Sequence, residues 1–80
     1  MTRGRESGFQ PEVEQLFLSS LEKVPQDAEL RYALASYYLR AGMAARAMLQ
    51  LRLVLSADSD HAAASRDLGD LEAGETRGRR

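Results

Sequence analysis

A single glycine separates two helical patterns in the middle of this chain, and that spacing limits its fold more than any other feature. Residues 28–41, which follow the N-cap candidate Asp27, carry apolar side chains at the 3.6-residue period, and the same period resumes from Ala44 to Ala57. Gly42 lies between them, and glycine adopts the left-handed conformation that ends a helix without steric cost. Almost no residues remain for a loop, so the two helices are expected to form a tight antiparallel hairpin.

Two further helices are expected beside this hairpin. One begins at Pro11, which suits the first turn of a helix, and ends before Pro25, because the residue preceding a proline avoids the α region. The other begins at His61, after a cap by Asp60, and ends at about Glu72. No segment alternates like a strand, so the sequence predicts an all-α fold of about four helices.

The helix over residues 28–41 has apolar side chains on two of its sides. Tyr37 and Tyr38 are adjacent, and adjacent residues on a helix point about 100° apart. We therefore expect Tyr37 to contact the preceding helix and Tyr38 to contact the following helix, which the small Ala35 allows to approach closely.

Leu49 and Leu53 lie outside the main apolar side of the helix over residues 44–57. We expect them to pack against the last helix, since buried faces are the usual place for paired leucines. The alternative is an exposed patch that binds a partner.

Composition argues against catalysis. The chain has one histidine and no cysteine, so it contains no cysteine nucleophile, thiolate metal site or disulfide. The spacings typical of a serine nucleophile elbow, a phosphate-binding loop or a zinc site are absent from the sequence. Asp60 next to His61 is expected to cap a helix rather than to form an acid–base pair or bind a metal. We expect no enzyme, cofactor or metal.

Charge separates the chain into basic ends and an acidic body. Residues 1–8 and 77–80 hold five arginines and one glutamate, whereas residues 9–76 carry a net charge of −5. Contacts of these arginines with nucleic acid phosphates are a less favoured alternative, because the body is acidic and no aromatic residue lies among the arginines. The expected organisation is a disordered basic tail, a helical domain and a second disordered basic tail, at residues 1–9, 10–73 and 74–80.

Apolar runs in the sequence are only a few residues long, short of the roughly 20 needed to cross a bilayer. The N-terminal arginines are not followed by an apolar stretch, so a secretory signal is not expected. We therefore expect no membrane association and a cytoplasmic location.

The chain also repeats itself with an offset of 34 residues. Leu34-Ala35 recurs as Leu68-Gly69. Other pairs follow the same step: Val13 with Ala47, Phe17 with Leu51, and Pro25 with Ser59.

This period and the residues that carry it resemble the tetratricopeptide repeat family. The resemblance covers residues 10–72, as one complete repeat from Ala28 to about His61 between two half-repeats. The matching positions are Pro25, Leu34, Ala35, Tyr38, Gly42, Ala47 and Leu51, and the departures are Arg31, Ala44, Val54 and Ser59. The resemblance implies helical hairpins stacked as an α-solenoid, and a four-helix bundle with accidental periodicity is the alternative.

In this family the first helices of the repeats line a groove that accepts a peptide or helix. The resemblance therefore implies a non-catalytic protein–protein interaction module, such as an adaptor, chaperone or assembly subunit. Tyr32 and Arg40 are the preferred contact residues, because tyrosine and arginine dominate many interfaces, although Tyr32 covering the hairpin and Arg40 capping its helix are the alternative roles. The implied groove residues are Glu29, Tyr32, Ser36, Leu39, Arg40, Arg66 and Asp70.

Two refinements follow from the resemblance. Tyr32 and Ser36 stand where one subfamily has the lysine and asparagine that bind a C-terminal carboxylate, so that ligand is disfavoured. Half-repeats at both ends leave helix faces uncovered, which predicts self-association, a partner that completes the stack, or origin as a piece of a longer protein.

Overall fold

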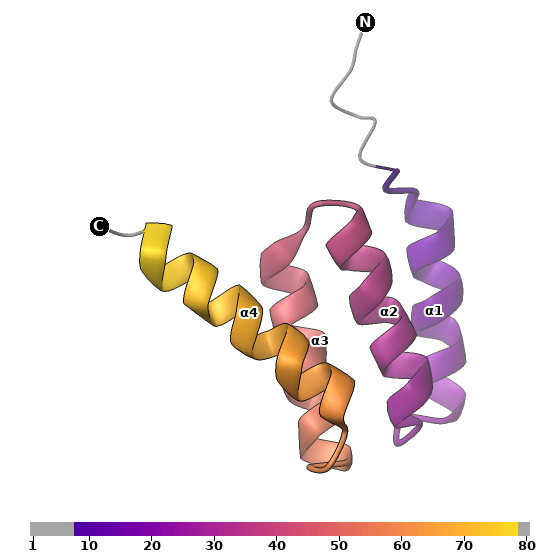
Figure 1. The fold of residues 1–80 in the computed structure, drawn as a ribbon. Coiled ribbons are helices and arrows are strands. Elements are labelled where there is room, and N and C mark those ends of the chain that lie inside the picture. The colour runs from indigo at the N-terminus through magenta and orange to yellow at the C-terminus, as the bar shows by residue number, and fades with distance from the viewer. Residues whose placement is uncertain (1–7, 79–80) are drawn as a thin grey trace, which may run out of the picture.

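The computed structural model describes residues 8–78, with side chains described as far as Gly74. Four α-helices follow one another and pack against their neighbours in sequence, and the contact between the second and third is the most extensive. Figure 1 shows α1 beside α2, and α4 crossing α3 with its C-terminal end directed away from it. Their bounds are α1 Pro11–Lys23, α2 Ala28–Arg40, α3 Ala44–Ala57 and α4 Ala62–Gly78. The predicted all-α fold of about four helices is confirmed.

The turn between α2 and α3 has the structure that its glycine predicts. Gly42 has φ of 77°, in the left-handed region. Its N–H donates to the carbonyl of Leu39, and the N–H of Met43 donates to the carbonyl of Tyr38, the two hydrogen bonds of a Schellman motif. At the other end of α2, the Asp27 carboxylate accepts a hydrogen bond from the backbone N–H of Leu30 at 3.0 Å, as expected of an N-cap.

The start of α4 differs from the prediction. The helix begins at Ala62, so the N-cap is His61, whose Nδ1 accepts a hydrogen bond from the N–H of Ala64 at 3.1 Å. Asp60 is not the cap. It lies within the preceding turn, where its backbone N–H donates to the side chain of Asp58.

The far end of α4 is also longer than the apolar pattern indicates. The helix continues to Gly78 rather than ending at about Glu72, so residues 74–78 are helical where a disordered tail was expected. At the other end Phe9, which was assigned to a tail, packs against the ring of Tyr37 with centroids 6.1 Å apart. The remainder of the two predicted tails, residues 1–7 and 79–80, lies outside the described residues.

The two adjacent tyrosines of α2, Tyr37 and Tyr38, have different packing neighbours. Tyr37 contacts Phe9 and Phe17 and donates from its hydroxyl to the carbonyl of Gln10 at 3.2 Å, so its predicted contact with the first helix is confirmed. Tyr38 is 3% exposed and packs in one cluster with residues of both α1 and α3. It therefore contacts two helices, where contact with α3 alone was expected.

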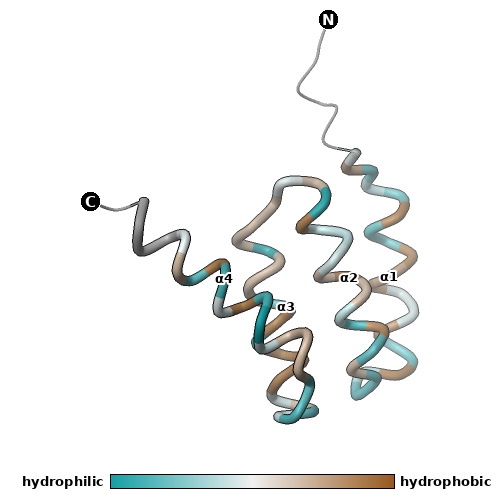
Figure 2. Tube along the Cα trace, viewed as in Figure 1, coloured by the Kyte–Doolittle hydropathy of each residue, from teal (hydrophilic) through white to brown (hydrophobic). Residues whose placement is uncertain are grey.

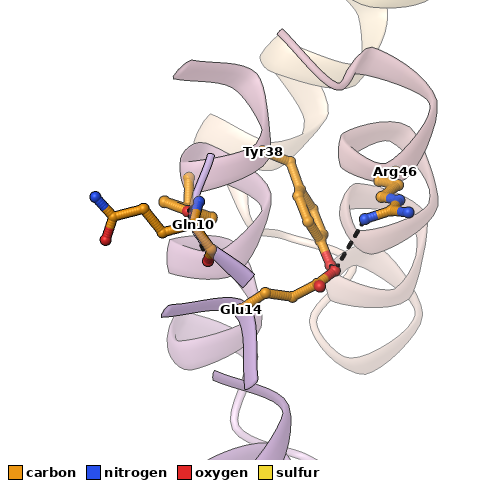
Figure 3. Close-up of polar contacts among 5 residues, drawn as sticks. Gln10, Glu14, Tyr38 and Arg46 are labelled. Carbon is orange, nitrogen blue, oxygen red and sulfur yellow. Dashed lines mark hydrogen bonds and ion pairs between the residues drawn. The ribbon is translucent and has the colours of Figure 1, made fainter. Parts of the chain in front are cut away.

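Figure 3 shows how Tyr38 joins three helices. Its hydroxyl donates to the Glu14 carboxylate of α1 at 2.5 Å, and Arg46 of α3 lies 3.1 Å from the same carboxylate oxygen. Burial and the hydrogen bond to Glu14 raise the pKa of Tyr38 to about 12.

The 34-residue repeat of the sequence recurs in the helix bounds. Helices α2 and α4 begin at Ala28 and Ala62, and α1 and α3 end at Lys23 and Ala57. In Figure 2 polar and apolar residues are interspersed along α1, α2, α3 and the coloured part of α4. A second core cluster, which joins α2, α3 and α4, consists of Ala35, Leu51, Val54 and Ala64. The solenoid arrangement and the family assignment stay predictions.

Candidate functional site

Tyr32, a preferred contact residue in the sequence, connects α2 to α4. Its hydroxyl donates to Asp67 Oδ2 at 2.6 Å, and its ring lies 4.8 Å from that of His61. The hydrogen bond to Asp67 and partial burial raise the pKa of Tyr32 above its ordinary value. The Tyr32 side chain is half-buried, and its hydroxyl is already hydrogen-bonded within the chain.

His61 completes this junction between the two helices. Its Nδ1 accepts the capping hydrogen bond, which places the proton of the neutral ring on Nε2. That buried nitrogen lies 3.1 Å from a Glu29 carboxylate oxygen but is not aligned with it, so it has no hydrogen-bond partner among the described residues. The structure thus places Glu29 and Tyr32, two of the predicted groove residues, beside His61, and Tyr32 also contacts Asp67.

The other predicted groove residues spread over a wider surface. Arg40, Arg66 and Asp70 are exposed, whereas Ser36 is half-buried. Arg66 lies 3.8 Å from Asp67, while Arg40 forms no hydrogen bond or ion pair with the described residues. Leu39 packs against the core cluster that contains Tyr38, so it faces inward. The charged members of the predicted set are exposed, whereas Leu39 contributes to packing.

Two leucines on α3 have a different environment from the one expected. Leu49 and Leu53 are 53% and 39% exposed, so they do not pack against α4 as predicted. The reason is geometric, because α4 lies along the side of α3 that carries Leu55 and Met48, and the two leucines are on the outer side. The alternative, an exposed apolar patch, is the observed arrangement.

A pocket of about 510 Å³ opens where α4 diverges from α3. Its volume lies within the roughly 300–1,000 Å³ typical of ligand sites. The lining residues are Ala44, Ala45, Met48, Asp70, Leu71 and Gly74. Of these only Asp70 was predicted as a site residue. The sequence feature that indicates the other lining residues is the presence of small side chains at the start of α3 and at Gly74. Small side chains leave space between the two helices.

Ala45 connects the pocket with the two exposed leucines. Residues four positions apart on a helix lie above one another on one face, so Ala45, Leu49 and Leu53 form a line along α3. We call this line, Ala45, Leu49 and Leu53, the α3 stripe. Its N-terminal end is a wall of the pocket.

No group of three or more histidine, cysteine, aspartate or glutamate side chains within the described part is arranged to hold a metal ion. None of the described helices is both long and apolar enough to cross a bilayer.

Comparison with protein-family models, curated proteins and solved structures finds no match to this chain.

Proposed function

We propose that this chain is a non-catalytic protein–protein interaction module that binds a helix or peptide of another protein. The observation that carries the proposal is the exposure of Leu49 and Leu53, at 53% and 39% of their surface. Two leucines one turn apart present an apolar line, the arrangement by which a helix pairs with another helix. The pocket at the end of the α3 stripe adds a concave feature that scattered surface leucines lack.

The resemblance to tetratricopeptide repeats supports the same function, because proteins of that family act by binding other proteins. The accessible groove residues Glu29, Arg40, Arg66 and Asp70 supply charges that select among partners. A cytoplasmic adaptor, chaperone or assembly subunit is the setting that this function suggests.

Co-purification from the native host, with partners identified by mass spectrometry, tests the proposal. The double variant Leu49→Ser/Leu53→Ser is expected to lose the partner that the unchanged chain retains. Leu16→Ser is the matched control, because Leu16 is a leucine of α1 that is more exposed than either, at 68%. Helicity by circular dichroism should be unchanged in both variants, since all three side chains lie at the surface. Retention of the partner by the double variant contradicts the proposal.

Self-association is the second candidate, and the apolar surface of α1 favours it. Leu16 on α1 and Val24, the C-cap residue that follows α1, are 68% and 46% exposed, so apolar residues are presented to solvent by α1 and its end as well as by α3. Light scattering distinguishes the candidates: self-association predicts a mass that rises with concentration, and a constant monomer mass at high concentration excludes it.

A further inference from the structure

The pocket between α3 and α4 has a filled counterpart elsewhere in the same molecule. Thirty-four residues before Leu71, Tyr37 occupies the corresponding junction of α1 and α2. There the Tyr37 ring lies 5.9 Å from Phe17 and 6.1 Å from Phe9, and its hydroxyl reaches the backbone of Gln10. An aromatic ring therefore closes the first junction.

The second junction, where α4 diverges from α3, has smaller side chains at the corresponding positions. Leu71 stands at the position of Tyr37, and Ala44 stands at that of Gln10. Gly74 replaces Arg40 in the same way, and a Cβ atom added at Gly74 meets no atom within 4 Å. The pocket of about 510 Å³ thus lies beside Leu71, at the position where the preceding junction has the aromatic ring of Tyr37.

The single charged group of the pocket lining is acidic. Asp70 is exposed and forms no hydrogen bond or ion pair with any described residue. The next carboxylate on α4, Glu72, is already paired with Arg52 at 3.3 Å. A ligand segment that brings a cation to the rim therefore meets a carboxylate that has no ion-pair partner within the described part of the chain.

We propose that this pocket receives an aromatic side chain of a partner protein segment that also carries a lysine or arginine, which pairs with Asp70. The inference rests on the proposed function and names its ligand chemistry. A partner helix that lies along the α3 stripe reaches the pocket at Ala45, so both surfaces belong to one interface.

Selection from a displayed library of randomised helical peptides, on the immobilised full chain, tests the proposal. Gly74→Leu fills the pocket, and the open space at its Cβ position makes the change compatible with the fold. Gly69→Leu is the matched control, since Gly69 is also an exposed glycine of α4 with nothing near its Cβ position, and it does not line the pocket. Asp70→Asn removes the charge while keeping the shape.

Selected peptides are expected to share an aromatic residue with a lysine or arginine nearby. Gly74→Leu should weaken their binding at least about tenfold, as loss of a hot-spot contact does, and Gly69→Leu should leave it unchanged. Asp70→Asn should weaken it by about threefold, the size of a rim ion pair, and less at high salt.

Four results overturn the inference. One is a selection in which no peptide is sensitive to Gly74→Leu, and another is a set of pocket-dependent peptides without the aromatic and basic residues. The third is self-association of the chain that Gly74→Leu abolishes, which makes a second copy the occupant. Peptides that bind the Gly74→Leu variant with full affinity, yet require Leu49 and Leu53, refute the proposal that the pocket binds an aromatic side chain. The proposed function as an interaction module then still stands.

Discussion

Asp27 and His61 perform the same task 34 residues apart in the chain. Each is the N-cap of its helix, and each accepts a hydrogen bond from the backbone N–H three residues later, at 3.0 Å for Asp27 and 3.1 Å for His61. The hydrogen bonds of the preceding turns also correspond, since the N–H of Asp27 donates to Val24 and that of His61 donates to Asp58. The internal repeat is therefore visible in the turn geometry as well as in the sequence.

Asp27→Ala is expected to destabilise the fold. The substitution removes the side-chain acceptor for the first turn of α2, which costs about 0.5–2 kcal/mol of the free energy of unfolding. Asp60→Ala is the control: the Asp60 side chain caps no helix in the described structure, so a change within about 0.5 kcal/mol is expected. Urea unfolding followed by circular dichroism measures both, and a larger loss for Asp60→Ala would show that the assignment of the α4 cap to His61 is wrong.

Glu14→Ala is expected to cost more than Glu12→Ala. Both residues lie in the first turn of α1 and interact favourably with the helix dipole, but only Glu14 accepts the hydrogen bond of the buried Tyr38 hydroxyl. Removing that acceptor leaves a buried donor unpaired, at about 1–3 kcal/mol. Comparison of the two variants by chemical denaturation cancels the dipole contribution, and equal losses would contradict the role of the Tyr38–Glu14 contact.

Stability is expected to fall between about pH 10 and about pH 12. Tyr38 keeps its proton in the folded chain up to a pKa of about 12, whereas the ordinary value is 10.0. The unfolded chain therefore releases this proton first, so the contribution is complete below pH 10 and is lost as the pH rises toward 12. Tyr32, whose pKa is also raised, contributes in the same direction.

Tyr38→Phe isolates that pH dependence. The variant keeps the ring in the core and removes the titrating group, so its free energy of unfolding should decline less steeply over this pH range. Denaturation at a series of pH values measures the two slopes. Parallel curves for the variant and the unchanged chain would mean that another group is responsible.

Tyr32→Phe is expected to loosen α4 selectively. The hydroxyl supplies the hydrogen bond to Asp67, and its loss leaves α4 held mainly by its contact with α3 and by the core cluster around Ala64. Hydrogen exchange should therefore increase in α4 while α1 stays protected. A uniform increase over all four helices would indicate a global loss of stability instead.

Local chemistry explains which parts of the fold can be predicted from the sequence. Asp27, Gly42 and Pro25 act through their own backbone or the nearest turn, so the bounds of α2 and the hairpin follow directly from these residues. The contact of Tyr37 with α1 is predicted correctly because α1 is the only helix available on that side of α2. The 34-residue offset can be read directly from the sequence, and it recurs in the starts of α2 and α4 and in the ends of α1 and α3.

Features that depend on how one helix crosses another are not predictable in the same way. His61 is the N-cap of α4, although aspartate is the better capping residue type. The reason is that the turn that begins at Asp58 ends at His61 rather than at Asp60, so the helix begins after His61. Leu49 and Leu53 remain exposed because α4 crosses α3 and leaves its outer side free. The pocket is the space left by that divergence, so no periodicity indicates it, whereas small residues at Ala44 and Gly74 provide a weak signal.

The central claim, that the α3 stripe binds another protein, is tested most directly by photo-crosslinking in the native host. A photo-reactive phenylalanine analogue replaces Leu49 on the stripe or, as a control, the exposed Ser19 of α1. We expect a covalent adduct with one other protein from position 49 and none from position 19. An adduct from position 19 alone, or adducts from position 49 with further copies of the same chain only, would contradict the account.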